Sequence, residues 1–100
     1  MVGRSRLRNT SSQEQCDTLI KSARDEKTRI EIEIIKYKKG KIDADQLKQK
    51  YVDMCDRLNN DVDRFEKEYK NYPEDVLDLM RSTDNTILQT QTLIDHAIGQ

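Results

Sequence analysis

The stretch KYKKGKIDADQLKQKY, residues 36–51, decides the fold because it contains a helix end followed closely by a helix start. Its first four positions carry three lysines, and cations in a last turn are stabilised by the negative end of a helix. Gly40 follows, and glycine readily takes the left-handed conformation that terminates helices. The sequence therefore predicts that a first helix ends near residue 39.

A second helix is predicted to begin only a few residues later. Asp43 is a favoured N-cap residue, and Gln46 stands three positions after it, as in a capping box. Ile42 and Leu47 have the spacing of a hydrophobic staple across the same helix start. Because such short connections join antiparallel neighbours, residues 36–51 predict a helical hairpin.

Helical periodicity extends from this turn in both directions, with apolar residues at spacings of three and four. Before the turn the seam is Cys16, Ile20, Ala23, Lys27, Ile30, Ile34 and Tyr37. After it the seam is Leu47, Tyr51, Met54, Leu58, Val62, Phe65 and Tyr69. The first seam keeps the heptad spacing of coiled coils, and the second has the longer period of a nearly straight bundle helix.

A third helix is predicted after the only proline, Pro73, which fits a first helical position. Its expected seam is Leu77, Met80, Asp84, Ile87, Gln91, Ile94 and Ile98. At the other end of the chain, Ser11 with Glu14, or Ser12 with Gln15, fits a capping box that would start the first helix. The expected helices are 12–39, 43–71 and 74–98.

These elements predict an all-α protein: an antiparallel helical hairpin plus a third helix, forming an up-down-up, coiled-coil-like three-helix bundle over residues 11–100. Residues 1–10 are polar and aperiodic, which predicts a disordered basic arm. The alternative is a hairpin whose third helix packs elsewhere after the proline.

The amino-acid composition excludes some classes of function. The chain is 37% charged and 34% hydrophobic, which leaves a modest core and favours helices that complete their burial against a partner chain. Basic residues do not gather over a folded region, so the pattern is not that of a nucleic-acid-binding domain. The sequence shows no membrane-spanning run and no signal peptide, so we expect a cytoplasmic, reducing compartment, with peripheral membrane contact left open.

The sequence offers little catalytic chemistry. It has no CxxC, HExxH or glycine-rich phosphate loop, and its single histidine, His96, lies near a helix end with only Asp95 adjacent. We therefore expect no enzyme activity, catalytic residue, metal or cofactor. In the predicted hairpin, Cys16 and Cys55 lie in layers about 16 Å apart, so they are expected to remain free thiols.

The basic arm carries Arg4, Arg6 and Arg8 with no acidic residue. Three interpretations stay open. It is a solubilising tail, an electrostatic contact to an acidic partner, nucleic acid or an anionic membrane, or a truncated organelle-targeting peptide.

Apolar residues outside the seams are the main candidates for partner binding. They are Ile32, Ile35, Leu79, Leu88 and Leu93. Some of them are expected to occupy second core positions, and the rest to form an exposed patch of the kind that marks partner surfaces.

Polar residues inside the seams form a predicted polar layer of Lys27, Asp84 and Gln91. If the first and third helices are parallel, Lys27 lies at a height between the other two. We expect its ammonium to reach Asp84, Asp56 or the Gln91 carbonyl, or to extend to the bundle edge. Alternatively, Lys27 points to solvent through a gap. A buried polar layer would restrict register and the number of partners.

Residues 55–76, CDRLNNDVDRFEKEYKNYPEDV, resemble the second helix and following turn in the N-terminal bundles of Qb-type t-SNAREs. The resemblance covers about a fifth of the chain and rests on residue types common in polar helices. It implies a regulatory three-helix bundle that binds trafficking partners. The 100 residues contain no membrane anchor and no full-length SNARE motif.

Taken together, the sequence predicts a non-enzymatic helical interaction module, an adaptor or scaffold subunit that packs against partner helices as a homo- or hetero-oligomer. The alternative is a regulatory or tethering bundle in vesicle trafficking whose basic arm contacts anionic membrane.

Overall fold

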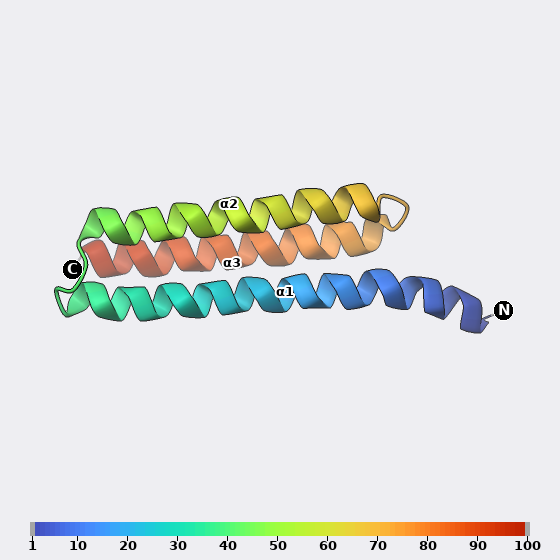
Figure 1. The fold of residues 1–100 in the computed structure, drawn as a ribbon, viewed down its shortest axis with the longest axis horizontal. Helices are drawn as coiled ribbons and strands as arrows, with labels where there is room; N and C mark the ends of the chain where they lie inside the picture. Colours follow the sequence, from blue (N-terminus) through green and yellow to red (C-terminus); the bar gives the residue numbers. More distant parts are fainter. Residues whose placement is uncertain (1, 100) are drawn as a thin grey trace.

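The computed structural model describes the backbone of residues 2–99 and the side chains of residues 11–99. It contains three helices: α1 (Val2–Lys38), α2 (Ala44–Glu68) and α3 (Pro73–Gly99). They lie side by side in a rod of 59 × 19 × 16 Å (Figure 1). α2 runs antiparallel to α1, and α3 returns parallel to α1, so the predicted up-down-up three-helix bundle is confirmed. The third helix packs on the hairpin rather than elsewhere.

The first turn forms as predicted. Gly40 has a φ of +77°, the Gly40 N–H donates to the Tyr37 carbonyl, and the Lys41 N–H donates to the Lys36 carbonyl. This pair of hydrogen bonds is the Schellman arrangement that satisfies carbonyls at a helix C-terminus.

The start of α2 is a complete capping box. The Gln46 N–H donates to the Asp43 carboxylate at 2.8 Å, and the Asp43 N–H donates to the Gln46 side-chain oxygen at 3.0 Å. Leu47 is fully buried, and Ile42 packs against the same core cluster. The hairpin is therefore fixed by local hydrogen bonds as well as by packing.

The second turn differs from expectation mainly in where α2 ends. α2 ends at Glu68, three residues before the predicted boundary, and Tyr69 caps it by donating its N–H to the Phe65 carbonyl. α3 begins at Pro73, with Glu74 and Asp75 in the first turn, where acidic side chains complement the positive helix end.

The start of α1 corrects the sequence interpretation. The helix begins at Val2, ten residues before the predicted start at residue 12. No proline interrupts residues 2–38, and each residue added to an existing helix costs little compared with nucleation. Ser12, expected near a cap, lies inside the helix with its side chain fully buried.

The core consists of two hydrophobic clusters along the rod. The cluster near the α1–α2 turn contains Ala23, Ile30, Ile34, Leu47, Met54, Leu58, Ile94 and Ala97. The cluster near the α2–α3 turn contains Cys16, Phe65, Val76 and Leu79. The predicted seams of α1 and α2 supply these positions, so both helices bury the expected faces.

α3 buries only part of its predicted seam: Ile94 is buried, and Ile87 and Ile98 are half-buried against the core cluster near the α1–α2 turn. The buried residues of α3 are Val76, Leu79, Thr83, Thr86, Thr90, Ile94 and Ala97, whereas Leu77, Met80, Asp84 and Gln91 are exposed. Threonine can be buried because its hydroxyl can bond to its own helix: the Thr90 hydroxyl donates to the Thr86 carbonyl at 2.7 Å. The prediction ranked larger apolar side chains above threonine, so the predicted stripe is rotated about the helix axis relative to the buried one and shares Ile94 with it.

Candidate partner-binding surface

The predicted partner-binding residues divide between the surface and the core. Ile32 is 50% exposed, Ile35 51% and Leu88 62%. Leu79 is 1% exposed and belongs to the core cluster near the α2–α3 turn, so it is one of the second core positions that the sequence left open. Leu93 is half-buried and packs against the other core cluster.

Among residues 11–99, three further large apolar side chains are exposed: Val52, Leu77 and Met80. Leu77 and Met80 were assigned to the core because they follow a regular seam, so only the observed rotation of α3 identifies them as surface residues. Val52 lies outside the seam of α2, and the off-seam criterion that selected Ile32 would have found it.

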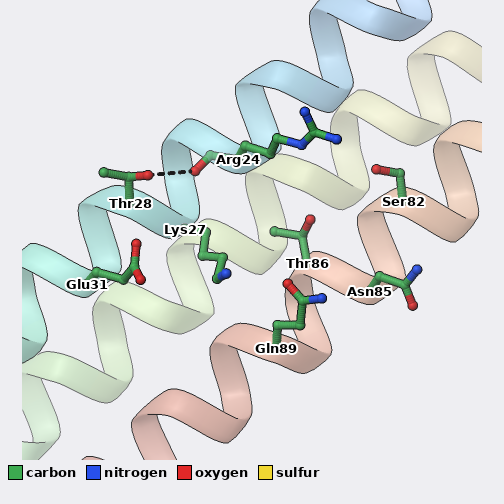
Figure 2. Close-up of a pocket in the computed structure, with 8 residues that line it drawn as sticks. All are labelled: Arg24, Lys27, Thr28, Glu31, Ser82, Asn85, Thr86 and Gln89. Atoms are coloured by element: carbon green, nitrogen blue, oxygen red, sulfur yellow. Dashed lines mark hydrogen bonds between the residues drawn. The ribbon is translucent and has the colours of Figure 1, made fainter.

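A polar groove of ≈510 Å³ runs between α1 and α3. Arg24, Lys27, Thr28 and Glu31 line it from α1, and Ser82, Asn85, Thr86 and Gln89 line it from α3. Figure 2 shows the Lys27 and Gln89 side chains reaching toward the space between the two helices. The lining is made of charges, hydroxyls and amides rather than apolar surface, so this groove has the chemistry of a hydrogen-bonding and ion-pairing surface.

The predicted polar layer does not assemble. Lys27 is half-buried in this groove, whereas Asp84 and Gln91 are exposed on α3 and do not line the groove. Within residues 11–99 no carboxylate forms an ion pair with the Lys27 ammonium. Because α3 is rotated so that a stripe of threonines is buried, Asp84 faces solvent instead of the bundle interior.

The opposite edge of α1, facing α2, has its charges paired within the chain. Arg57 of α2 donates to both oxygens of the Glu26 carboxylate, at 2.6 and 2.9 Å. The hydrogen bonds from Arg57 hold the pKa of Glu26 below its usual value, although burial acts in the other direction. Arg29 adds a longer contact to Glu26, and Lys36 lies 3.5 Å from Glu33. The Glu26–Arg57 pair joins the two helices, and the other two pairs lie within α1.

At the far end of the bundle, Asp75 of α3 joins α1 to the second turn. The Ser12 hydroxyl donates to the Asp75 carboxylate, and the Cys16 thiol donates to the Asp75 carbonyl at 3.6 Å. Burial, together with the nearby Asp75 charge, raises the pKa of Cys16 to about 11. The thiol therefore stays protonated near neutral pH and acts as a core residue.

Both cysteines are free thiols. Cys16 belongs to the cluster near the α2–α3 turn, and Cys55 packs against the other cluster, so the prediction that they do not pair is confirmed. Burial also raises the pKa of Cys55. Neither thiol has the lowered pKa of a nucleophilic cysteine.

The arginines of the predicted basic arm, Arg4, Arg6 and Arg8, have side chains outside the described residues. In the part of the chain that is described, no group of His, Cys, Asp and Glu residues is arranged to hold a metal ion. None of the described helices combines the length and apolar character that a membrane crossing requires.

Comparison with protein-family models, curated proteins and solved structures finds no match to this chain.

Proposed function

We propose that the chain is a non-enzymatic helical interaction module, a small adaptor or scaffold subunit that packs its outer helical surface against partner helices. The observation that carries the proposal is the exposure of large aliphatic side chains, foremost Leu88 at 62%, Ile35 at 51% and Ile32 at 50%. Covering aliphatic side chains of this size with a partner removes apolar surface from water and so makes the free energy of association more favourable.

The rest of the molecule supports an interaction role. The two turns are short, and both ends of α2 carry satisfied caps, so the helices form a fixed scaffold that presents its outer faces. The groove between α1 and α3 adds donors and acceptors that could align a partner helix.

The test is affinity purification of the chain from its native source, comparing the wild type with an Ile32→Ser/Leu88→Ser variant by quantitative mass spectrometry. We expect at least one helical protein to be enriched with the wild type and reduced at least about tenfold with the variant, since removing buried aliphatic contacts weakens association. The control is Lys67→Glu, which changes an exposed residue of α2, a helix that carries neither Ile32 nor Leu88. Equal recovery by all three proteins would overturn the proposal.

A second candidate is a tethering bundle at a membrane surface, and the length of α1 favours it. α1 has 37 residues against 25 in α2 and 27 in α3, and its N-terminal end projects beyond the turn between those two helices (Figure 1). The projecting segment carries the sequence's basic cluster, and cations near an anionic membrane are attracted to it.

Liposome co-sedimentation separates the two candidates. The tethering function requires binding to vesicles with anionic lipid that is lost when residues 1–10 are removed. Binding that does not change on truncation, or no binding by the intact chain, would exclude it.

A further inference from the structure

The edge of α1 that borders α3 and the groove carries a second periodic set of residues. In order along the helix these are Asp17, Ile20, Arg24, Lys27 with Thr28, Glu31, Ile35 and Lys38. They recur at spacings of three and four, as expected for one face of a helix. All are exposed or half-buried. Ile20 in this set also packs against the core cluster near the α2–α3 turn, and the other members belong to neither core cluster.

This edge differs from the opposite edge of α1 in its electrostatics. On the α2 side, Glu26, Arg29, Glu33 and Lys36 all take part in ion pairs within the chain. Among residues 11–99, no such pair is formed by Arg24, Lys27 or Glu31. The groove edge therefore keeps charges of both signs available for another molecule.

When two copies of this edge are placed side by side in opposite directions, residues of opposite charge face each other and apolar residues face apolar residues. Placing two copies of α1 antiparallel, with a two-fold axis between Lys27 and Thr28, sets Arg24 opposite Glu31 of the other copy. The same axis sets Asp17 opposite Lys38, and Ile20 opposite Ile35. A two-fold axis repeats each of these contacts, because the same surface is used by both copies.

α3 is compatible with the same axis. Lys27 and Thr28 are the middle residues of the groove lining on α1, and Asn85 and Thr86 are the middle residues on α3, so an axis through the middle of the groove passes close to all four. Ser82 of one copy then faces Gln89 of the other, which pairs a hydroxyl with an amide. Both side chains can donate and accept hydrogen bonds.

We propose that the groove face between α1 and α3 binds a second copy of this chain, in an antiparallel, two-fold symmetric dimer held by reciprocal Arg24–Glu31 ion pairs and Ile20–Ile35 contacts. The proposal deepens the interaction function proposed above by naming one partner. The contact is mostly polar, so the dimer is weak and sensitive to salt, since exposed charges are screened.

Sedimentation equilibrium of the full chain over a range of concentrations tests the proposal. We expect a reversible monomer–dimer equilibrium whose dissociation constant rises at least about tenfold between about 0.02 M and about 0.5 M salt. Arg24→Glu and Glu31→Arg should each weaken the dimer at least about tenfold, because each variant places like charges opposite one another twice. The Arg24→Glu/Glu31→Arg double variant restores opposite charges and should recover the wild-type dimer.

Lys67→Glu, the matched charge change on α2, should leave the equilibrium unchanged, and circular dichroism confirms that each variant keeps its helices. A wild type that remains monomeric overturns the proposal, as does a dimer that neither single variant weakens or that the double variant fails to recover. If the wild type is monomeric but Arg24→Glu removes a protein captured in the affinity purification, the groove binds that protein and not a second copy. The affinity purification with the Ile32→Ser/Leu88→Ser variant does not depend on these outcomes. The proposed interaction function and the proposed dimer can therefore fail separately.

Discussion

At the scale of single residues, burial in this protein is decided by which way a helix faces rather than by residue type. Leu79 and Leu88 lie on the same helix, yet Leu79 is 1% exposed and Leu88 is 62% exposed. Threonines occupy core positions on α3 while Leu77 and Met80 are exposed. The side chains that stabilise the bundle are therefore not always the most hydrophobic ones.

Replacing Leu79 by alanine tests this directly. Leu79→Ala should lower the free energy of unfolding by about 2–5 kcal/mol, because it leaves a cavity in the cluster near the α2–α3 turn. Leu88→Ala makes the same chemical change at an exposed position and should alter stability by less than about 0.5 kcal/mol. Urea unfolding followed by circular dichroism measures both, and equal losses would show that the two leucines have similar surroundings.

The Glu26–Arg57 pair is the second prediction at this scale. Glu26→Gln should lower the free energy of unfolding at neutral pH by about 1 kcal/mol, since the carboxylate is nearly buried but Arg57 is 55% exposed. The pKa of Glu26 is lowered in the folded protein, so its contribution is present above the unfolded pKa of about 4.3 and is lost as pH falls through the lowered value.

The stability difference between wild type and Glu26→Gln should therefore shrink below about pH 4, as measured by urea unfolding at neutral and acidic pH. Glu66→Gln, at an exposed position of α2, provides the comparison at each pH. A difference that stays constant down to acidic pH would contradict the assigned ion pair.

At the scale of elements, the helices are defined by local signals at their ends. The capping box at Asp43 and the left-handed Gly40 specify the first turn, and Pro73 specifies the start of α3. These signals act within a few residues, so they do not depend on how the helices pack. They fix where each helix turns and leave its rotation about its own axis to the core.

Gly40→Ala measures how much the first turn depends on backbone conformation. Nothing lies within 4 Å of a Cβ atom added at Gly40, so the cost comes from its φ of +77° and not from a clash. The free energy of unfolding should fall by about 1–2 kcal/mol.

Gly99→Ala is the matched control, because an added Cβ there also meets nothing within 4 Å and Gly99 has no positive φ. It should leave stability unchanged or raise it slightly, since alanine favours helix. Thermal unfolding compares the two variants, and a Gly40→Ala protein as stable as Gly99→Ala would rule out a left-handed requirement at the turn.

At the scale of the whole molecule, the bundle is a rod whose described core begins at Ser12 and Cys16. The part of α1 that projects beyond α2 and α3 has no second helix beside it in Figure 1. The molecule thus combines a packed three-helix body with a single-helix extension.

Removing residues 1–10 should therefore change the free energy of unfolding of the bundle by less than about 1 kcal/mol, because the projecting end of α1 has no second helix beside it (Figure 1). Helical content should fall, since α1 begins at Val2 in the intact chain. Circular dichroism and urea unfolding measure the two effects. A loss of several kcal/mol would mean that the extension packs on the bundle, and it would disqualify the truncation as a control for membrane binding.

The sequence by itself determined the helical class, the number of helices, the two turns and the buried faces of α1 and α2. Caps such as Asp43 with Gln46 act locally, and an unbroken apolar seam has one favoured orientation, so neither requires knowledge of distant residues. The N-terminal helix start was not predicted, because helix propagation into residues 2–10 leaves no periodic apolar signal.

Only the tertiary structure decided the rotation of α3 and everything that follows from it. Two stripes on that helix have suitable spacing, and the packed bundle buries the threonine stripe, whose hydroxyls can bond within the helix. That choice moves Leu79 into the core, leaves Leu77 and Asp84 in solvent, and places Thr86 together with Lys27 in the lining of the groove. A helix sequence with two usable faces cannot reveal which one it buries, because burial depends on the shape of the neighbouring helices.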